Sequence, residues 1–101
     1  MPIGHIGINV SDLEVSYSYY SALMSYLDYQ PFLADDDQFA IRPADNKNGA
    51  YIFFYPVQGT YHPACAGLQH LAFIVPTRDK VKEATLAAHR LDSEIVHTPK
   101  E

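Results

Sequence analysis

Two histidines open two similar apolar segments of this chain, and their type and spacing suit metal chemistry. His5 begins the segment HIGINV, and His70 begins the segment HLAFIV 65 positions later. Imidazole is a general ligand of transition metals, and a catalytic metal site commonly has three protein ligands and an open position. A lone strand histidine is more often structural, but two equivalent strands related by a pseudo-twofold axis would turn both imidazoles toward one cleft. The pair therefore predicts a divalent-metal site with His5 and His70 as ligands.

The segments that follow the two histidines indicate an internal repeat. Ser11 and Glu14 form a capping box at the start of one helix, and Thr77 is suited to cap a second helix. The two predicted helices end in the similar phrases LDY and LDS, which lie 64 positions apart. Two matches at nearly one offset predict one structural unit and the start of a second copy.

The first unit is expected to be a strand, a helix and three further strands. Their predicted bounds are residues 3–10, 12–27, 29–33, 38–42 and 50–57. Alternation in the first strand places Ile6, Ile8 and Val10 on one face, and His5 and Asn9 on the other. We expect the helix to cover the first of these faces with one apolar stripe. The stripe consists of Leu13, Tyr17, Tyr20, Met24 and Leu27.

The second unit is expected to be incomplete. It is predicted to contain a strand over residues 70–75, a helix over 78–91 and a short strand over 93–97. The expected buried stripe of its helix consists of Val81, Ala84, Ala88 and Leu91. Nothing before Glu101 corresponds to the strands 38–42 and 50–57. Such a sheet has an open edge that must be covered, blunted or paired with another chain, and we therefore expect a homodimer.

Aromatic side chains give the first unit a candidate ligand-binding surface. In the strand 50–57, Tyr51, Phe53 and Tyr55 share one face. Such a face would line an apolar pocket with a few polar groups, as small-molecule sites generally have. Asn9 lies beside His5 on the face of the first strand and can form hydrogen bonds. We therefore predict that these aromatic residues and Asn9 contact a substrate or ligand.

Other chemically suggestive residues are assigned to ordinary structural roles. The three adjacent acids Asp35, Asp36 and Asp37 lack the alternate ligand spacing of a calcium loop, and we interpret them as a solvated turn. His62 is interpreted as a loop residue, and His89 as a solvated or structural residue of the second helix.

Composition excludes several classes of partner. The net charge is −5, and no basic cluster is present that would neutralise the phosphates of a nucleic acid. No apolar run approaches the roughly 20 residues that span a bilayer. The single cysteine, Cys65, excludes an internal disulfide and fits a reducing compartment. We expect a soluble cytoplasmic protein whose partners are a small molecule and a second copy of the chain.

The two histidine segments, HIGINVSDL followed by a tyrosine-rich helix and GLQHLAF, resemble the glyoxalase/bleomycin-resistance/extradiol-dioxygenase group, the vicinal oxygen chelate superfamily. The resemblance implies an α+β fold: a cupped mixed sheet with helices on its outer face. Residues 1–101 then form a single domain, with a βαβββ module over 1–60 and an incomplete βαβ copy over 67–101. The resemblance also implies that His5 and His70 are first-strand ligands of a divalent iron, manganese, zinc or nickel ion acting as a Lewis acid.

The chain departs from the ligand sets of this family at two positions. Glyoxalase-type members add an acidic ligand from the last strand of the first module, where this chain has Phe53 or Tyr55. Extradiol-type and fosfomycin-type members take a glutamate from the last strand of the second module. By the repeat alignment, Glu94 and Glu101 lie too early to replace it. The predicted site therefore holds two of three ligands.

Three interpretations of function remain open from the sequence. The first is a metal-dependent lyase or extradiol-type dioxygenase, or a truncated relative of one, with its catalytic residues unassigned. The second is a metal-free module that sequesters a small molecule, as bleomycin-resistance proteins do. The third is a catalytically dead remnant in which the histidines are structural.

Overall fold

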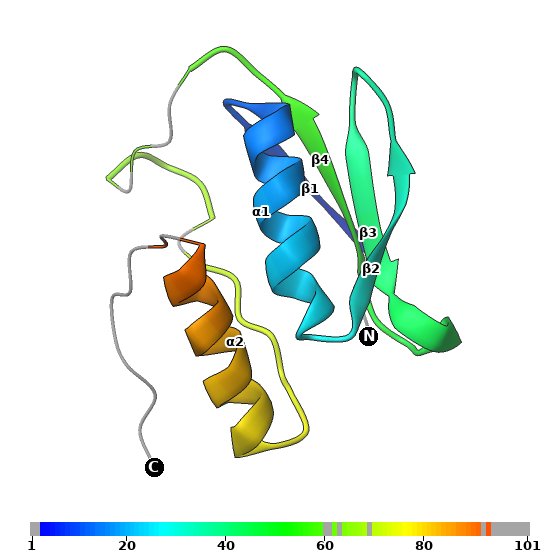
Figure 1. The fold of residues 1–101 in the computed structure, drawn as a ribbon. Coiled ribbons are helices and arrows are strands. Elements are labelled where there is room, and N and C mark those ends of the chain that lie inside the picture. The colour runs from blue at the N-terminus through cyan, green and yellow to red at the C-terminus, as the bar shows by residue number, and fades with distance from the viewer. Residues whose placement is uncertain (1–2, 60–61, 63, 69, 92, 94–101) are drawn as a thin grey trace.

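The computed structural model describes residues 3–59, 62, 64–68, 70–91 and 93. Its elements follow the order predicted for the first unit, namely a strand, a helix and three strands, and a second helix comes later (Figure 1). They are β1 (His5–Val10), α1 (Leu13–Ser25), β2 (Tyr29–Ala34), β3 (Phe39–Pro43), the 3-10 turn η1 (Ala44–Asn46), β4 (Tyr51–Pro56) and α2 (Arg78–Arg90). The α+β class and the βαβββ module are confirmed.

The four strands form one mixed sheet in the order β1-β4-β3-β2. The first strand pairs in parallel with β4, so that His5 lies opposite Tyr51. The other pairs are antiparallel, with Phe39 opposite Phe54 and Gln30 opposite Arg42. Consequently β1 and β2 are the two edge strands of the described sheet, and neither has a second partner within it.

The core lies between α1 and the sheet. Met24 of the helix packs with side chains from the two central strands, and all of these are almost fully buried. The strand residues are Phe39, Ile41, Ile52 and Phe54. The ring of Phe54 stacks between Phe39, at 4.3 Å, and Tyr20, at 4.8 Å. The predicted apolar stripe of α1 is thus confirmed, because all five of its members reach this core. Four of them belong to the core or pack against it, and the fifth, Tyr17, meets the core residue Phe39 edge to face.

The first helix begins one residue later than the predicted capping box. Asp12 is the N-cap, with an extended backbone, and its Oδ1 accepts a hydrogen bond of 3.1 Å from the Val15 amide. We expect Asp12→Ala to lower the free energy of unfolding by about 1 kcal/mol, because one amide at the helix start loses its acceptor. Ser11→Ala, the matched control, should change it by less than about 0.5 kcal/mol. Urea unfolding of both variants measures the difference, and an equal loss in both would refute Asp12 as the cap.

The second helix packs beside α1, on the side of α1 away from the sheet (Figure 1). Thr77 caps it as predicted, accepting a hydrogen bond from the Lys80 amide. The predicted buried stripe is only partly right. Ala87 is the buried residue, at 3% exposure, whereas Val81 is 38% exposed. A helix that packs against one other helix buries a narrower strip than a helix laid across a sheet, and here that strip is centred on Ala87.

The predicted strand over residues 70–75 is wrong, because the structure places these residues in no strand. In the first unit the equivalent segment, β1, exists because it pairs with β4. Among the described residues that follow His70, there is no strand that could play the part of β4. Phe73 of this segment instead contacts the ring of Tyr29, with centroids 6.0 Å apart. The predicted strand over 93–97 lies, apart from Ser93, outside the described residues.

Within the described part of the chain, no helix has the length and apolar character needed to cross a bilayer.

Candidate functional site

The two faces of the sheet differ in what covers them. Both helices lie on one side of the sheet in Figure 1, so no helix among the described elements covers the other side. We call this second side the open face. The helix-side residues of the two central strands are almost fully buried, and those of the open face alternate with them along each strand. The open face consists of His5, Gly7, Asn9, Gln30, Phe32, Leu33, Ala40, Arg42, Tyr51, Phe53 and Tyr55.

The structure brings most of the predicted site residues together on the open face. Tyr51, Phe53 and Tyr55 follow one another along β4, and β1 runs beside them. The exposed imidazole of His5 meets the Phe53 ring edge to face, with centroids 5.8 Å apart. Asn9 is exposed and lies opposite Tyr55 at the other end of the strand pair. Local alternation, which the sequence shows directly, is the reason that these predictions agree with the structure.

One aromatic residue of the open face was not predicted from the sequence. The pairing of β2 with β3 is irregular between Pro31 and Leu33, so Phe32 is an extra residue in its strand. Its ring lies 5.4 Å from that of Tyr51 and 6.1 Å from that of Phe53. A β-bulge commonly directs a side chain in this way. The only feature of the sequence that could have indicated this bulge is Pro31, because a proline within a strand is typical of edge strands and bulges.

Tyr29 fixes the end of the sheet next to this face. Its hydroxyl donates a hydrogen bond of 2.8 Å to the carbonyl oxygen of Ala50, immediately before β4. Burial raises the pKa of Tyr29, so this donor is retained further into the alkaline range than that of an exposed tyrosine. The bond therefore ties the start of β2 to the start of β4.

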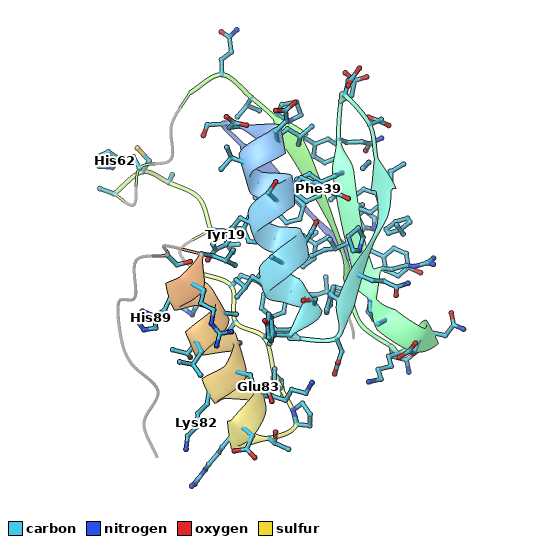
Figure 2. The ribbon with its side chains drawn as sticks, in the orientation of Figure 1. Tyr19, Phe39, His62, Lys82, Glu83 and His89 are labelled. Atoms are coloured by element: carbon cyan, nitrogen blue, oxygen red, sulfur yellow. The ribbon has the colours of Figure 1, made fainter. Side chains whose placement is uncertain are left out.

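The structure does not place His70 at the start of a strand. His70 is exposed and lies in the segment that leads to α2, so it does not occupy a position equivalent to that of His5. Two further histidines of the described residues lie apart from the open face: Figure 2 shows His62 and His89 beyond α1 as seen from the sheet. As predicted, His62 is a loop residue, and its Nδ1 accepts a hydrogen bond from the Ala64 amide. His89 is exposed in the last turn of α2.

The described residues around His5 do not fit a three-ligand metal centre. The side chains that flank its imidazole on β4 are Tyr51 and Phe53, neither of which is a usual ligand. Within the described ranges, no three residues among His, Cys, Asp and Glu come close enough together to hold a metal ion. The acidic run at Asp35 is the solvated turn that was predicted, because the Asp35 carboxylate accepts hydrogen bonds from the amides of Asp37 and Gln38.

Comparison with known proteins identifies the family of this chain. A family model described as the Glyoxalase/Bleomycin resistance protein/Dioxygenase superfamily matches residues 2–101. No match is found among the curated proteins. Among solved structures, the crystal structure of a putative glyoxalase from Bacillus halodurans is similar, with 26% identity and a TM-score of 0.81. The match covers 94% of this chain and 72% of that one. The chain therefore belongs to the glyoxalase/bleomycin resistance protein/dioxygenase superfamily.

Proposed function

We propose that this protein binds a planar small molecule on the open face of its sheet. The observation that carries the proposal is the aromatic surface formed by Phe32, Tyr51, Phe53 and Tyr55. Three of these four residues are 38–39% exposed, and the ring of Phe32 contacts those of Tyr51 and Phe53. A contiguous exposed apolar patch with polar groups at its margin is typical of a binding site. His5 and Asn9 supply such polar groups at the two ends of β1.

The physical basis of binding would be stacking and desolvation. Aromatic rings prefer offset or edge-to-face contacts, which contribute about 0.5–1.5 kcal/mol beyond the burial of area. The rings of Phe32 and Phe53 are already held edge to face by their neighbours, so a ligand would lose little free energy in ordering them.

The test uses 2-naphthamide, a neutral planar probe, and ligand-observed NMR, which detects weak binding. We expect the probe to bind and Phe53→Ala to weaken binding about tenfold, because the central ring of the surface is lost. Leu86→Ala is the matched control, since Leu86 is an exposed apolar residue of α2. A probe that binds equally to both variants would refute a binding role for the open face.

A metal-dependent enzyme is the second candidate, and His5 is the residue that favours it. The imidazole is exposed on the open face at the start of β1, the position of the first-strand ligand in the resemblance described above. A divalent metal there would supply Lewis acidity. His70 would then have to join it from the segment before α2, together with a third ligand.

Elemental analysis of purified, tag-free protein separates the two candidates. We expect no stoichiometric metal, because the described surroundings of His5 offer aromatic rings in place of a second and third donor. About one iron, manganese, zinc or nickel ion per chain, lost in both His5→Ala and His70→Ala, would overturn this expectation and favour the enzyme.

We also propose that the protein is a homodimer. The proposal is supported by the unpaired edge of β1 and by the absence of any described element over the open face. Light scattering should give twice the 11.3 kDa mass of the chain, and a monomeric mass would contradict the proposal.

A further inference from the structure

The residues of the open face form rows that run across the sheet from one strand to the next, and neighbouring rows differ in polarity. The strand register places His5 beside Tyr51 and Arg42 beside Gln30, and the β3–β4 pairing, continued by one residue, places Tyr51 beside Arg42. These four side chains form one continuous row, which we call the polar row. With strands about 4.8 Å apart, the row is about 14 Å long. Each of its members carries a hydrogen-bonding group.

The next row along the sheet is apolar. It contains Gly7, Phe53 and Ala40, which lie side by side in the register, and the ring of Phe32 packs against that of Phe53. Ala40 is completely buried although it lies on the open face. Apolar side chains therefore occupy the middle of the face. The polar row lies at one end of the face, and Asn9 and Tyr55 lie at the other.

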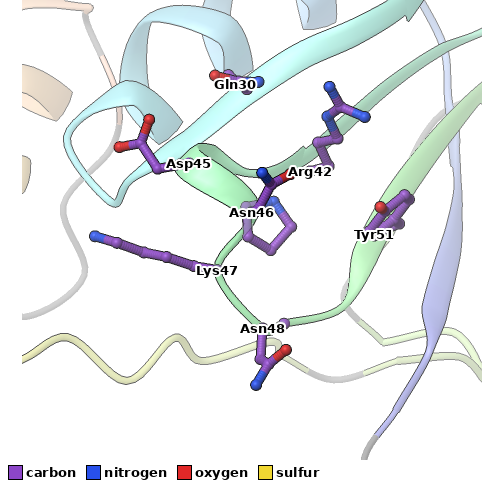
Figure 3. A pocket seen from close by; sticks show the side chains of 9 residues that line it. Gln30, Arg42, Asp45, Asn46, Lys47, Asn48 and Tyr51 are labelled. Carbon is purple, nitrogen blue, oxygen red and sulfur yellow. The ribbon is translucent and has the colours of Figure 1, made fainter.

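A pocket of about 450 Å³ adjoins this end of the face (Figure 3). Gln30, Arg42 and Tyr51 of the polar row line it, and η1 together with the turn that follows supplies its rim. Asp45 and Asn46 of η1 both have positive φ angles, 56° and 57°. Non-glycine residues seldom adopt this conformation, although Asn and Asp tolerate it best. The strained turn presents three consecutive polar side chains, Asn46, Lys47 and Asn48, at the rim.

Two charged groups of this pocket, Asp45 and Arg42, have no ion-pair partner among the described residues. Arg42 is the cation of the two. Its guanidinium lies 5.1 Å from the centre of the Phe32 ring, and the side chain is half-buried. The ion pairs of the described residues join Asp28 to Lys47 and to Lys80 and leave Arg42 out. In Figure 3 the side chains of Asp45 and Lys47 extend to the opposite side from Arg42 and Tyr51. A guanidinium held in this way by a ring offers its donors to a bound molecule.

We infer that the ligand of the open face carries a carboxylate, which Arg42 binds while the planar body of the ligand lies on Phe53 and Phe32. The inference rests on the proposed function and narrows the ligand to a planar carboxylic acid. A guanidinium fits a carboxylate through two parallel N–H···O hydrogen bonds. The amide of Gln30 and the hydroxyl of Tyr51, on either side of Arg42 in the row, can donate further hydrogen bonds to the same oxygens.

The experiment compares 2-naphthoate with 2-naphthamide, which has the same ring system and no charge. We expect the wild-type protein to bind the carboxylate about 10- to 100-fold more tightly than the amide at low ionic strength. Arg42→Gln should abolish this preference, so that the variant binds the two probes equally. Lys47→Gln is the matched control, because it removes one positive charge from the same pocket. It should keep the preference within about twofold, since Lys47 is engaged by Asp28.

The outcomes distinguish this inference from the proposed function. Equal binding of the two probes, or a preference that survives in Arg42→Gln, would overturn the inference while the open face still binds ligands. A preference lost equally in Lys47→Gln would also overturn it, because the effect would then be the general charge of the pocket. If neither probe binds the wild-type protein, the proposed function itself fails. A far-ultraviolet circular dichroism spectrum of Arg42→Gln that matches the wild type shows that the variant is folded.

Discussion

Replacement of Phe54 by alanine is expected to lower the free energy of unfolding by about 3–5 kcal/mol. The side chain is 1% exposed and lies at the centre of the core, stacked between Phe39 and Tyr20. Truncation removes the ring from both stacks and leaves a cavity that Phe39 and Ile52, each held in a central strand, cannot fill. A small domain has only about 5–15 kcal/mol of stability, so much of the protein would unfold under mild conditions.

Tyr55→Ala is the matched control for this prediction, because it removes an aromatic ring from the neighbouring position of the same strand. Tyr55 is 39% exposed on the open face, and its ring lies over Gly7, 3.4 Å from where a Cβ atom would stand there. We expect a loss of less than about 1.5 kcal/mol, measured by urea unfolding monitored by circular dichroism. Equal losses in the two variants would contradict the assignment of the core to the helix side of the sheet.

Replacement of Gly49 by alanine is expected to destabilise the protein by about 1–3 kcal/mol. A Cβ atom there would lie 2.9 Å from Cγ of Pro43 and 3.3 Å from the hydroxyl oxygen of Tyr29. Neither neighbour can move easily, because Pro43 is a buried ring at the end of β3 and the Tyr29 hydroxyl is bonded to the Ala50 carbonyl. The backbone before β4 must shift instead, which also weakens that hydrogen bond.

Thermal unfolding measures this effect, since 1 kcal/mol shifts the melting temperature of a domain of this size by about 4–8 °C. Gly4→Ala is the control, because no atom lies within 4 Å of a Cβ built there. It should change stability by less than about 0.5 kcal/mol. If Gly49→Ala melts at the same temperature as Gly4→Ala, the close packing of this turn on Tyr29 and Pro43 is refuted.

The sequence alone predicted those features of the fold that depend on residues close together in the chain. Strand alternation has a period of two residues, so it placed His5 and Asn9 on one face of β1 and gathered Tyr51, Phe53 and Tyr55 on one face of β4. The helical stripe through Tyr20 and Met24 identified the surface that packs on the sheet. Local patterns also indicated the order of a strand, a helix and three strands, and the family resemblance added the expectation of a cupped mixed sheet with helices on its outer face.

The tertiary structure decided the features that depend on residues distant in the sequence. A strand requires a partner strand to pair with. Residues 70–75 have the same alternating pattern as β1, but no described strand takes the place of β4 beside them. They therefore do not form a strand. The bulge in β2 brings Phe32 onto the open face, and cross-strand register brings Arg42 between Tyr51 and Gln30. Periodicity specifies which face a side chain occupies, but only the pairing of strands specifies its neighbours, and the proposed ligand follows from those neighbours.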